Sequence, residues 1–496
     1  MTFMPSSDYL RTTYRNVSSA IMLLLIVTLT GCATPSPEVS EDFEANWATK
    51  HYSAKAYLIP SAPEAFVRRV DLIRNAETSI DITYFSWDKD ALGLILLNEL
   101  KKAADRGVQV RLALDDLLVF NEQWLADIDA HHNIQIRIFN PFNSRKMGWL
   151  GRATDFQLNQ DKLDNRLHEK YFNVDHHTLL LGGRNIGNEY FGYSQKANFY
   201  DLDVIFKGNV INAFADNYES LWQSGNLIPI SQLIMIKEPG NYSHFNKEYE
   251  HSLYYDTDII ADILYHLEHL TDINYLPVTV TPVFDSIKKL DDNKPYFRSR
   301  VKHLIKAELD NAQHATISSP YMVPTNGKFE ILEQLTNQGA NVQVVTNSSA
   351  SNDSGFIPAY YEKHRETLLS MGINIFEYKD QARNSDHYYH TDTYYHNKTI
   401  ILDNKVSYIG SSNFDPRSDF LNLELGLIVY SEDFATQLHH YLFKERDSLY
   451  WQVTRDSENN TLWLSEDHIY DSNPNYSHWH AFPDWVIRKM DGESEL

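Results

Sequence analysis

The chain has 496 residues, enough for two or three domains, and its hydrophobic fraction of 43% is typical of a globular protein. It carries 44 Lys and Arg residues against 67 Asp and Glu residues, a formal net charge of -23. Nucleic-acid binding usually needs a basic surface, so this balance argues against a nuclease, although a local basic groove stays open. The single cysteine excludes a disulfide within the chain.

The N-terminus has the pattern of a secretory signal. Arg11 and Arg15 precede an apolar run over residues 20–29, which is too short to span a bilayer comfortably. The L-T-G-C stretch ending at Cys32 resembles a bacterial lipobox, in which lipid is attached to the cysteine and the preceding peptide is removed. We therefore expect a lipoprotein signal peptide over residues 1–31 and lipidation of Cys32. An uncleaved anchor helix is the alternative.

The residue after the cysteine is Ala33, not Asp. By resemblance to lipoprotein sorting in Gram-negative bacteria, this favours the outer membrane, facing the periplasm. The following residues up to 55 are rich in Pro, Ser and acidic side chains. We interpret residues 32–55 as a tether above the membrane.

Strand and helix patterns then alternate along a first domain, predicted over residues 56–222. A helix is expected from Pro63 to Ala76, a strand from Ser79 to Trp87, a second helix ending at Arg106, and a strand from Val108 to Leu114. This alternation is the signature of an α/β sheet.

The same order returns in a second domain, predicted over residues 297–450. Its expected elements are a helix over 301–312, a strand over 315–322, a helix over 328–339 and a strand over 341–346. The repeat indicates internal duplication. Residues 223–296, with five prolines, are interpreted as an insertion or linker, and residues 451–496 as a C-terminal extension.

Two short stretches, one in each half, share a single frame. In each, a His is followed by a Lys two residues later, an Asp seven later, a Gly fourteen later and an Asn seventeen later. These residues are His168, Lys170, Asp175, Gly182 and Asn185, and His396, Lys398, Asp403, Gly410 and Asn413.

The alternation over residues 396–402 predicts a strand with His396 and Lys398 on one face. A cation beside an imidazole suits a negatively charged oxygen. Two such pairs suit a phosphodiester.

With these paired H-K-D motifs, the chain resembles the phospholipase D superfamily. The stretches G-G-R-N-I-G-N-E-Y-F (182–191), S-P-Y-M-V-P (319–324) and G-S-S-N-F-D-P-R-S (410–418) are similar to bacterial cardiolipin synthases of the type C branch. The resemblance covers residues 57–449. It implies two α/β/α sandwich domains, related by internal duplication, whose motifs meet in one cleft across a pseudo-twofold interface.

The expected catalytic residues are those of the motifs: His168, Lys170, Asp175, His396, Lys398 and Asp403. The lysines can neutralise phosphate charge. A neutral His can attack phosphorus while a protonated His gives its proton to the leaving alcohol. The resemblance implies a phospho-histidine intermediate. We expect His168 to be the nucleophile and His396 the acid/base, with the reverse order as the alternative.

Four further residues are expected to bind phosphate or orient the imidazoles. Asn185 and Asn413 can donate hydrogen bonds to phosphoryl oxygens. Glu424 lies 28 residues after His396, where the family places an orienting carboxylate, and Asp201 has the matching place in the first half. The alternative for both carboxylates is a surface acid at a strand end.

Within the motifs, Asp175 and Asp403 end their strands, and we expect them to hold the local turns rather than touch substrate. His387, His390 and His396 could suggest a zinc site, yet no cysteine or carboxylate spacing supports one. Neither a metal nor a cofactor is expected.

The expected reaction is transfer of a phosphatidyl group from one phospholipid to the headgroup alcohol of another. The expected partners are phospholipids, phosphatidylglycerol first and phosphatidylethanolamine second, with no nucleic acid, and the chain is expected to be a membrane-anchored monomer. Hydrolysis to phosphatidic acid is the first alternative, because acceptor choice depends on the exclusion of water. Export to the periplasm favours lipid remodelling or hydrolysis. A nuclease and a non-catalytic tethered lipoprotein are further alternatives.

Overall fold

The computed structural model describes residues 38–40, 47, 49–119, 122–143, 148–355, 357–466 and 468–476. The expected signal peptide and Cys32 lie outside the described residues. Among the helices that are described, none combines the length and the apolar character needed to cross a membrane.

The first half forms a mixed sheet whose parallel strands alternate with helices, as the sequence predicts. Ser61 begins the first helix because its hydroxyl accepts a hydrogen bond from the Glu64 N–H, and Pro63 fits the first turn. The parallel strands are β2 (Ser79–Tyr84), β3 (Gln109–Asp115) and β4 (Ile134–Phe139), and the antiparallel strands are β6 (Tyr171–Val174), β7 (Thr178–Gly182) and β9 (Asp203–Gly208). The helices are α3 (Ala62–Asn75), α4 (Ala91–Asp105), α5 (Gln123–Asp129) and α8 (Val210–Gln223).

The second half repeats this pattern. Its parallel strands are β12 (His314–Ser318), β13 (Asn341–Asn347) and β14 (Asn374–Tyr378), and its antiparallel strands are β16 (Thr399–Leu402), β17 (Val406–Gly410) and β19 (Leu425–Tyr430). The helices are α13 (Tyr296–Leu304), α14 (Lys306–Asn311), α15 (Asn326–Asn337), α16 (Ile357–Ser370) and α18 (Glu432–Phe443). The helix expected over 301–312 is therefore two helices that meet at Ile305.

Two long strands join the halves into one continuous sheet. Strand β1 (Tyr52–Leu58) pairs with β9 of the first half, and β11 (Leu276–Phe284) pairs with β19 of the second. β1 and β11 pair with each other in antiparallel register, with Tyr52 opposite Val280. The sheet thus begins inside the range interpreted as a tether, and the range interpreted as an insertion supplies a central strand.

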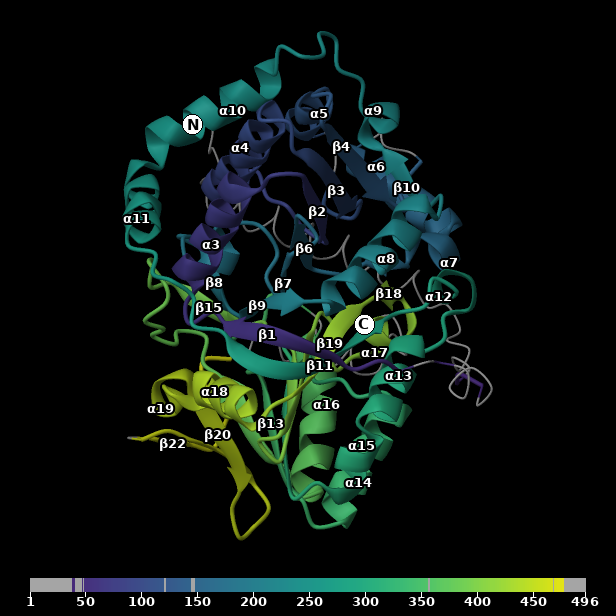
Figure 1. Ribbon diagram of the computed structural model, residues 1–496. Coiled ribbons are helices and arrows are strands. Elements are labelled where there is room, and N and C mark those ends of the chain that lie inside the picture. The colour runs from purple at the N-terminus through teal and green to yellow at the C-terminus, as the bar shows by residue number, and fades with distance from the viewer. Residues whose placement is uncertain are drawn as a thin grey trace, which may run out of the picture.

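Helices cover both faces of the sheet. On one face of the first half, α3, α4 and α5 pack over strand residues such as Ile82, Leu112 and Ile136. On the opposite face, α8 and α18 share one buried cluster that runs through both halves and includes Phe214 and Phe434. In the second half, α15 and α16 bury the other face. The predicted duplication of an α/β domain is confirmed, and Figure 1 places the first half above the second.

The remaining segments extend these two units. Helices α10 (Ser243–Tyr255) and α11 (Thr257–Glu268) lie outside α3, α4 and α5, around the upper left of Figure 1. Strands β20 (Tyr450–Arg455), β21 (Thr461–Leu464) and β22 (Ile469–Tyr470) extend the sheet beyond β14.

Candidate active site

Each motif histidine is held by backbone of the other half. The short strand β5 (Arg166–Leu167) runs parallel to β18 (Asn422–Leu423), and the His168 N–H donates to the Leu423 carbonyl at 3.1 Å. In the same way β8 (Ala197–Tyr200) runs parallel to β15 (Asp392–Tyr395), and the His396 N–H donates to the Tyr200 carbonyl at 2.9 Å. In both crossings the His N–H donates to a backbone carbonyl of the other half, which brings the two motifs into one site.

The residue after each accepting carbonyl is the orienting carboxylate. Nδ1 of His168 lies 3.0 Å from Oε1 and 3.1 Å from Oε2 of Glu424. Nδ1 of His396 lies 2.6 Å from Oδ2 of Asp201. Each half therefore orients the histidine of the other half. A carboxylate at Nδ1 holds the proton there and leaves Nε2 to reach a substrate.

The connection that carries His396 differs from the expected strand. β15 ends at Tyr395 and β16 begins at Thr399, so residues 396–398 link a small crossing sheet to the main sheet. His396 bonds across to Tyr200 and takes no part in the ladder of β16. The prediction of one strand over residues 396–402 was wrong, because the backbone of His396 pairs with the other half and the strand of the main sheet begins only at Thr399.

Aromatic rings enclose the imidazoles. Phe85 packs edge-on against His168, with ring centroids 5.5 Å apart, and Tyr190 and Phe199 lie 5.6 and 5.1 Å from the His396 ring. His168 is 8% exposed and His396 6%. Most of each ring is therefore removed from water.

Burial and neighbouring charges set the ionisation of the first pair. Burial lowers the pKa of His168 to about 4, with Lys170 adding to the effect against the opposing pull of Glu424. Burial alone would raise the pKa of Glu424, but His168 and Lys170 lower it to about 2. At neutral pH the imidazole of His168 is thus uncharged, beside an ionised carboxylate.

The carboxylate of the second pair is less acidic than that of the first. Burial, followed by Lys398 and Lys170, holds the pKa of His396 well below its usual value. Burial also raises the pKa of Asp201 to about 6, against the lowering effect of Lys398. The two histidines therefore sit beside carboxylates of unlike acidity, although their motifs match.

The two motif lysines lie beside the histidines that they follow. Lys170 Nζ donates to the His168 carbonyl at 2.7 Å, and Lys398 Nζ to the His396 carbonyl at 2.5 Å. Both are 2% exposed. Burial lowers the pKa of Lys398 to about 8 and that of Lys170 well below its usual value. The two-residue spacing thus folds each ammonium group back toward its own histidine.

The motif asparagines are also buried close to the crossing strands. Asn185 Oδ1 accepts from the Ser86 N–H at 3.3 Å. The backbone N–H of Asn413 donates to Ser418 Oγ at 2.9 Å. The buried side-chain Oδ1 of Asn413 has no hydrogen-bond partner among the described residues. The Asn413 amide keeps hydrogen-bonding capacity that the described protein atoms do not use.

The motif aspartates lie in the tight turns that follow β6 and β16. The Asp175 carboxylate accepts from the N–H groups of Glu77, Thr78 and Ser79 at 2.7–2.9 Å. Asp403 accepts from the N–H groups of Gln313 and His314 at 2.9 and 2.8 Å. Both aspartates have positive φ, at 56° and 49°. These bonds tie each turn to the start of a neighbouring strand.

Sequence reasoning missed the residues that hold the carboxylates. Ser411 Oγ and Ser418 Oγ donate to the two oxygens of Glu424, the latter at 2.8 Å. At the position matching Ser411, the first half has Gly183, where a Cβ would lie 2.4 Å from Asp201 Oδ1. The second residue of the G-G-R-N and G-S-S-N stretches therefore differs for a structural reason. Asp201 lies too close to the backbone for a side chain at 183, whereas Glu424 accepts a hydrogen bond from the Ser411 hydroxyl.

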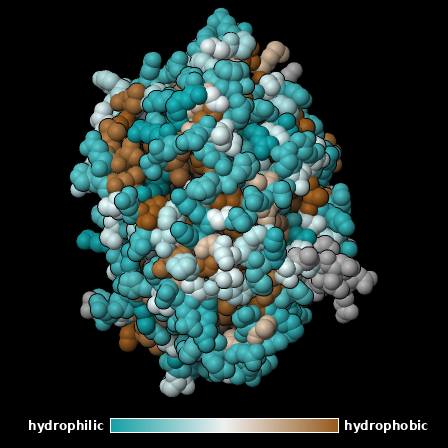
Figure 2. Space-filling model, in the orientation of Figure 1, coloured by the Kyte–Doolittle hydropathy of each residue, from teal (hydrophilic) through white to brown (hydrophobic). Residues whose placement is uncertain are grey.

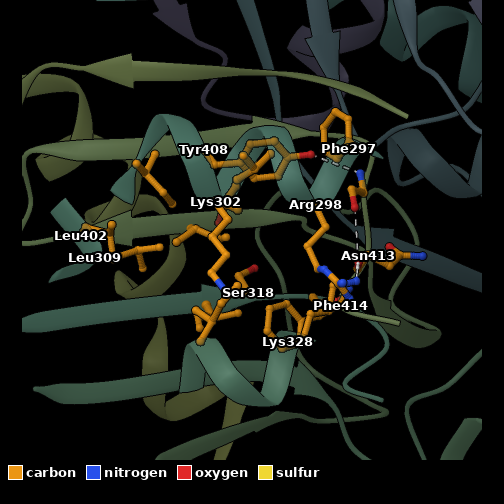
Figure 3. A pocket seen from close by; sticks show the side chains of 18 of the residues that line it. Phe297, Arg298, Lys302, Leu309, Ser318, Lys328, Leu402, Tyr408, Asn413 and Phe414 are labelled. Carbon is orange, nitrogen blue, oxygen red and sulfur yellow. Dashed lines mark hydrogen bonds between the residues drawn. The ribbon is translucent and has the colours of Figure 1, made fainter. Parts of the chain in front are cut away.

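An apolar cavity borders the second motif. It lies between α13, α14 and α15 and strands β12, β16 and β17, and Figure 3 shows its Leu309, Leu402 and Phe297 side chains. At its polar end Lys328 Nζ donates to the Asn413 carbonyl at 3.0 Å, and Arg298 pairs with Asp419 at 2.7 Å. The cations of this cavity are thus already paired with protein atoms.

No group of three or more His, Cys, Asp or Glu side chains is placed to hold a metal ion in the part of the chain that the structure describes.

Curated proteins of related sequence include several cardiolipin synthases. The chain is 31% identical to cardiolipin synthase C of Escherichia coli (strain K12) over 420 residues, which cover 81% of this chain and 86% of the relative. It is 24% identical to cardiolipin synthase 2 of Staphylococcus epidermidis over 373 residues, or 74% of this chain and 62% of that one.

Structural comparison agrees on the fold. The crystal structure of phosphatidylserine synthase from Haemophilus influenzae Rd KW20 superposes with a TM-score of 0.57 at 16% identity, covering 88% of this chain and 91% of that one. The profile of the family described as "Cardiolipin synthase, PLD-like domain" matches residues 70–222 and 305–446, one match in each half. The chain therefore belongs to this PLD-like family of the phospholipase D superfamily.

Proposed function

We propose that this protein is a phosphatidyltransferase of the phospholipase D type, similar to cardiolipin synthase. It moves a phosphatidyl group from one phospholipid to the headgroup alcohol of another. The crossed pairing of His168 with Glu424 and His396 with Asp201 carries this proposal, because it places two oriented imidazoles and two lysines in a single buried site. The synthase relatives in Escherichia coli and Staphylococcus epidermidis support the choice of reaction.

In the first step, Nε2 of His168 attacks phosphorus. The N–P bond forms as the bond from phosphorus to the leaving headgroup oxygen breaks, and His396 gives that oxygen a proton. Lys170 and Lys398 offset the charge on the phosphoryl oxygens. The ionised Glu424 supports His168 as the nucleophile, because it accepts a hydrogen bond from Nδ1–H and stabilises the positive charge that develops on the ring.

In the second step, His396 takes the proton of an acceptor alcohol. The alcohol oxygen attacks phosphorus, the N–P bond breaks, and His168 returns to its starting state. A bound phosphodiester adds negative charge beside both imidazoles and so favours the protonated His396 that the first step requires. Phosphatidylglycerol is the proposed lipid substrate, with phosphatidylethanolamine as a second donor.

Product analysis tests the reaction. Purified protein is incubated with phosphatidylglycerol vesicles, with and without phosphatidylethanolamine, and the lipids are identified by mass spectrometry. Cardiolipin with released glycerol or ethanolamine is expected, and it should disappear in His168→Ala and His396→Ala. Phosphatidic acid alone would make water the acceptor and overturn the transferase. His390→Ala is a matched control, since that exposed histidine lies outside the motifs.

We also propose that residues 1–31 are removed and that Cys32 carries lipid, so that residues 32–55 tether the enzyme to the outer membrane, facing the periplasm. Glu38 pairs with Arg298 of α13 at 2.6 Å. Glu38 lies six residues after Cys32, a reach of at most about 22 Å, so the anchor would attach near α13. Labelling cells with radioactive palmitate should mark the wild type and spare Cys32→Ser. Equal labelling of both would contradict lipidation.

The predicted ranges complete this proposal. They are a first phospholipase D-like domain over 56–222, an insertion over 223–296, a second domain over 297–450 and an extension over 451–496.

The single-site proposal also requires only one copy of the chain, and sedimentation of the detergent-solubilised protein as a monomer is the expected result.

A further inference from the structure

Helices α10 and α11 expose an unusual group of large side chains. Tyr254 is 75% exposed and Tyr255 66% at the end of α10, and Tyr265 is 56% exposed on α11. Leu253 and Leu264 beside them are 41% and 48% exposed. We call these five residues the α10–α11 surface. Figure 2 shows hydrophobic residues gathered at the upper left, where Figure 1 places the two helices.

This exposure is selective. The sequence has 31 tyrosines, and those of the described part that are more than a third exposed are Tyr254, Tyr255, Tyr265, Tyr388 and Tyr470. Tyr388 adjoins α11, as the contacts below establish, so four of these five residues gather on one side of the molecule. Random surface placement of tyrosine would scatter them.

Hydrogen bonds connect α11 to the loop beside the active site. Tyr193 donates to Asp262 at 2.6 Å, and Tyr389 donates to Asp258 at 2.7 Å. The Tyr193 ring lies 5.5 Å from the ring of Tyr388. Helix α11 is therefore fixed to residues 388–389.

That loop leads directly to the catalytic histidine. The Tyr388 N–H donates to the Gly192 carbonyl at 2.9 Å, and Tyr190, two residues before Gly192, packs on His396. A chain of contacts thus links helix α11 to a ring that packs on His396.

The charges on the two helices limit what this surface can bind. Among their residues and the connecting Asp256, a single Lys or Arg, Lys247, accompanies six acidic residues: Glu248, Glu250, Asp256, Asp258, Asp262 and Glu268. This balance gives no electrostatic attraction to an anionic lipid surface or to nucleic acid. Tyrosine rings with an apolar body and a polar tip suit the boundary between headgroups and acyl chains. The matching partner is a zwitterionic phospholipid surface.

We propose that the α10–α11 surface seats the enzyme on a zwitterionic phospholipid bilayer, on the side of the molecule where α11 contacts residues 388–389. This inference rests on the proposed phospholipid substrate. Binding comes from burial of tyrosine and leucine side chains and not from charge, so raised salt does not weaken it.

Fluorescence tests the contact without any turnover. The full chain carrying Tyr255→Trp is mixed with phosphatidylcholine vesicles whose acyl chains are brominated, and quenching is compared with that of the wild type. Additional quenching is expected, and it should persist at high salt. The control is Ile469→Trp, since Ile469 is 71% exposed on β22, far from the two helices in Figure 1. Equal quenching at both positions, none at 255, or its loss at high salt would overturn the proposal.

Kinetics test its role. On zwitterionic phosphatidylcholine vesicles that contain a minor fraction of phosphatidylglycerol, the triple variant Tyr254→Ser/Tyr255→Ser/Tyr265→Ser should turn over the phosphatidylglycerol about tenfold more slowly. It should process monomeric dihexanoyl-phosphatidylglycerol as the wild type does. An equal loss on both substrates, or no loss on vesicles, would contradict the inference. A wild type inactive on both lipids would instead refute the proposed function, and the quenching result would still decide the membrane contact.

Discussion

Glu424, in the second half of the chain, lies 3.0 Å from Nδ1 of His168 in the first half. Asp201 in the first half makes the reciprocal contact with His396 at 2.6 Å. Among the described residues, the carboxylate at Nδ1 of each histidine comes from the other half, so the two halves must be assembled before these pairs can form. The duplicated fold supplies two copies of the motif, and the exchange of carboxylates joins them into one candidate site.

The first prediction separates the roles of the two histidines. Glu424→Gln removes the negative charge that holds His168, and kcat should fall roughly 10²- to 10⁴-fold. Asp201→Asn should act through His396 and slow proton transfer to the leaving group. We expect a p-nitrophenyl phosphatidyl ester, whose leaving group needs no proton, to restore much of the first-step rate of Asp201→Asn and none of that of Glu424→Gln.

Release of p-nitrophenol in a rapid-mixing experiment measures that step. His396→Ala should behave as Asp201→Asn does, and His168→Ala as Glu424→Gln does. The opposite assignment, with the activated ester rescuing His168→Ala, would make His396 the nucleophile.

The second prediction concerns acidic pH. Because burial lowers the pKa of His168 to about 4, this histidine stays neutral at pH 5, where an ordinary histidine is mostly protonated. With the p-nitrophenyl ester, kcat/KM should stay level down to about pH 5 and fall only near pH 4. A decline centred near pH 6.5 would place the nucleophile in a solvated setting and contradict the burial described above.

The third prediction concerns basic pH. Burial lowers the pKa of Lys398 to about 8, so its amine is charged below that pH and neutral above it. KM for the ester should therefore rise above about pH 8, as attraction to the phosphate is lost. Lys398→Arg keeps its charge across this range, so its KM should be higher than that of the wild type at pH 7 but should rise less above pH 8, with the remaining rise due to Lys170, whose pKa burial also lowers. A rise in Lys398→Arg as large as that of the wild type would assign the effect to a group other than Lys398.

The fourth prediction separates stability from catalysis within the motifs. Asp175→Ala leaves three backbone N–H groups without their acceptor, and the free energy of unfolding should fall by about 1–2 kcal/mol while kcat on folded protein stays near that of the wild type. Asp175→Asn should be milder, since asparagine tolerates positive φ. Denaturant unfolding and active-site titration measure the two effects.

The same turn gives a pH signature. Burial opposes ionisation of Asp175, but hydrogen bonds from Ser79, Glu77 and Thr78 outweigh it and lower its pKa. A lowered carboxyl pKa stabilises the fold above the unfolded value near 4 and loses that contribution as pH falls through the folded value. The stability difference between wild type and Asp175→Ala should therefore shrink below about pH 4. A difference that is constant with pH would contradict this origin.

Much of the fold could be predicted from the sequence, and the structure brings the candidate histidines and their candidate orienting carboxylates together. Helix α3 and strand β3 each begin and end one residue from the predicted limits, because capping residues and apolar alternation are local signals. The contact of Glu424 with His168 could not be predicted, since it depends on which strands pair across 256 residues. The same reason explains two further differences: the strand that stops before His396 and the central position of β11. Both depend on strand pairing between the two halves, which local sequence signals do not reveal.

Trapping the covalent intermediate tests the central claim most directly. Wild-type protein is mixed with phosphatidylglycerol labelled with ³²P, quenched in alkali within milliseconds, and digested for peptide mapping. The account predicts an acid-labile phosphoryl label on the peptide that contains His168, enriched in Asp201→Asn on the p-nitrophenyl ester and absent in His168→Ala. Label on the His396 peptide, or turnover without any labelled histidine, would contradict it.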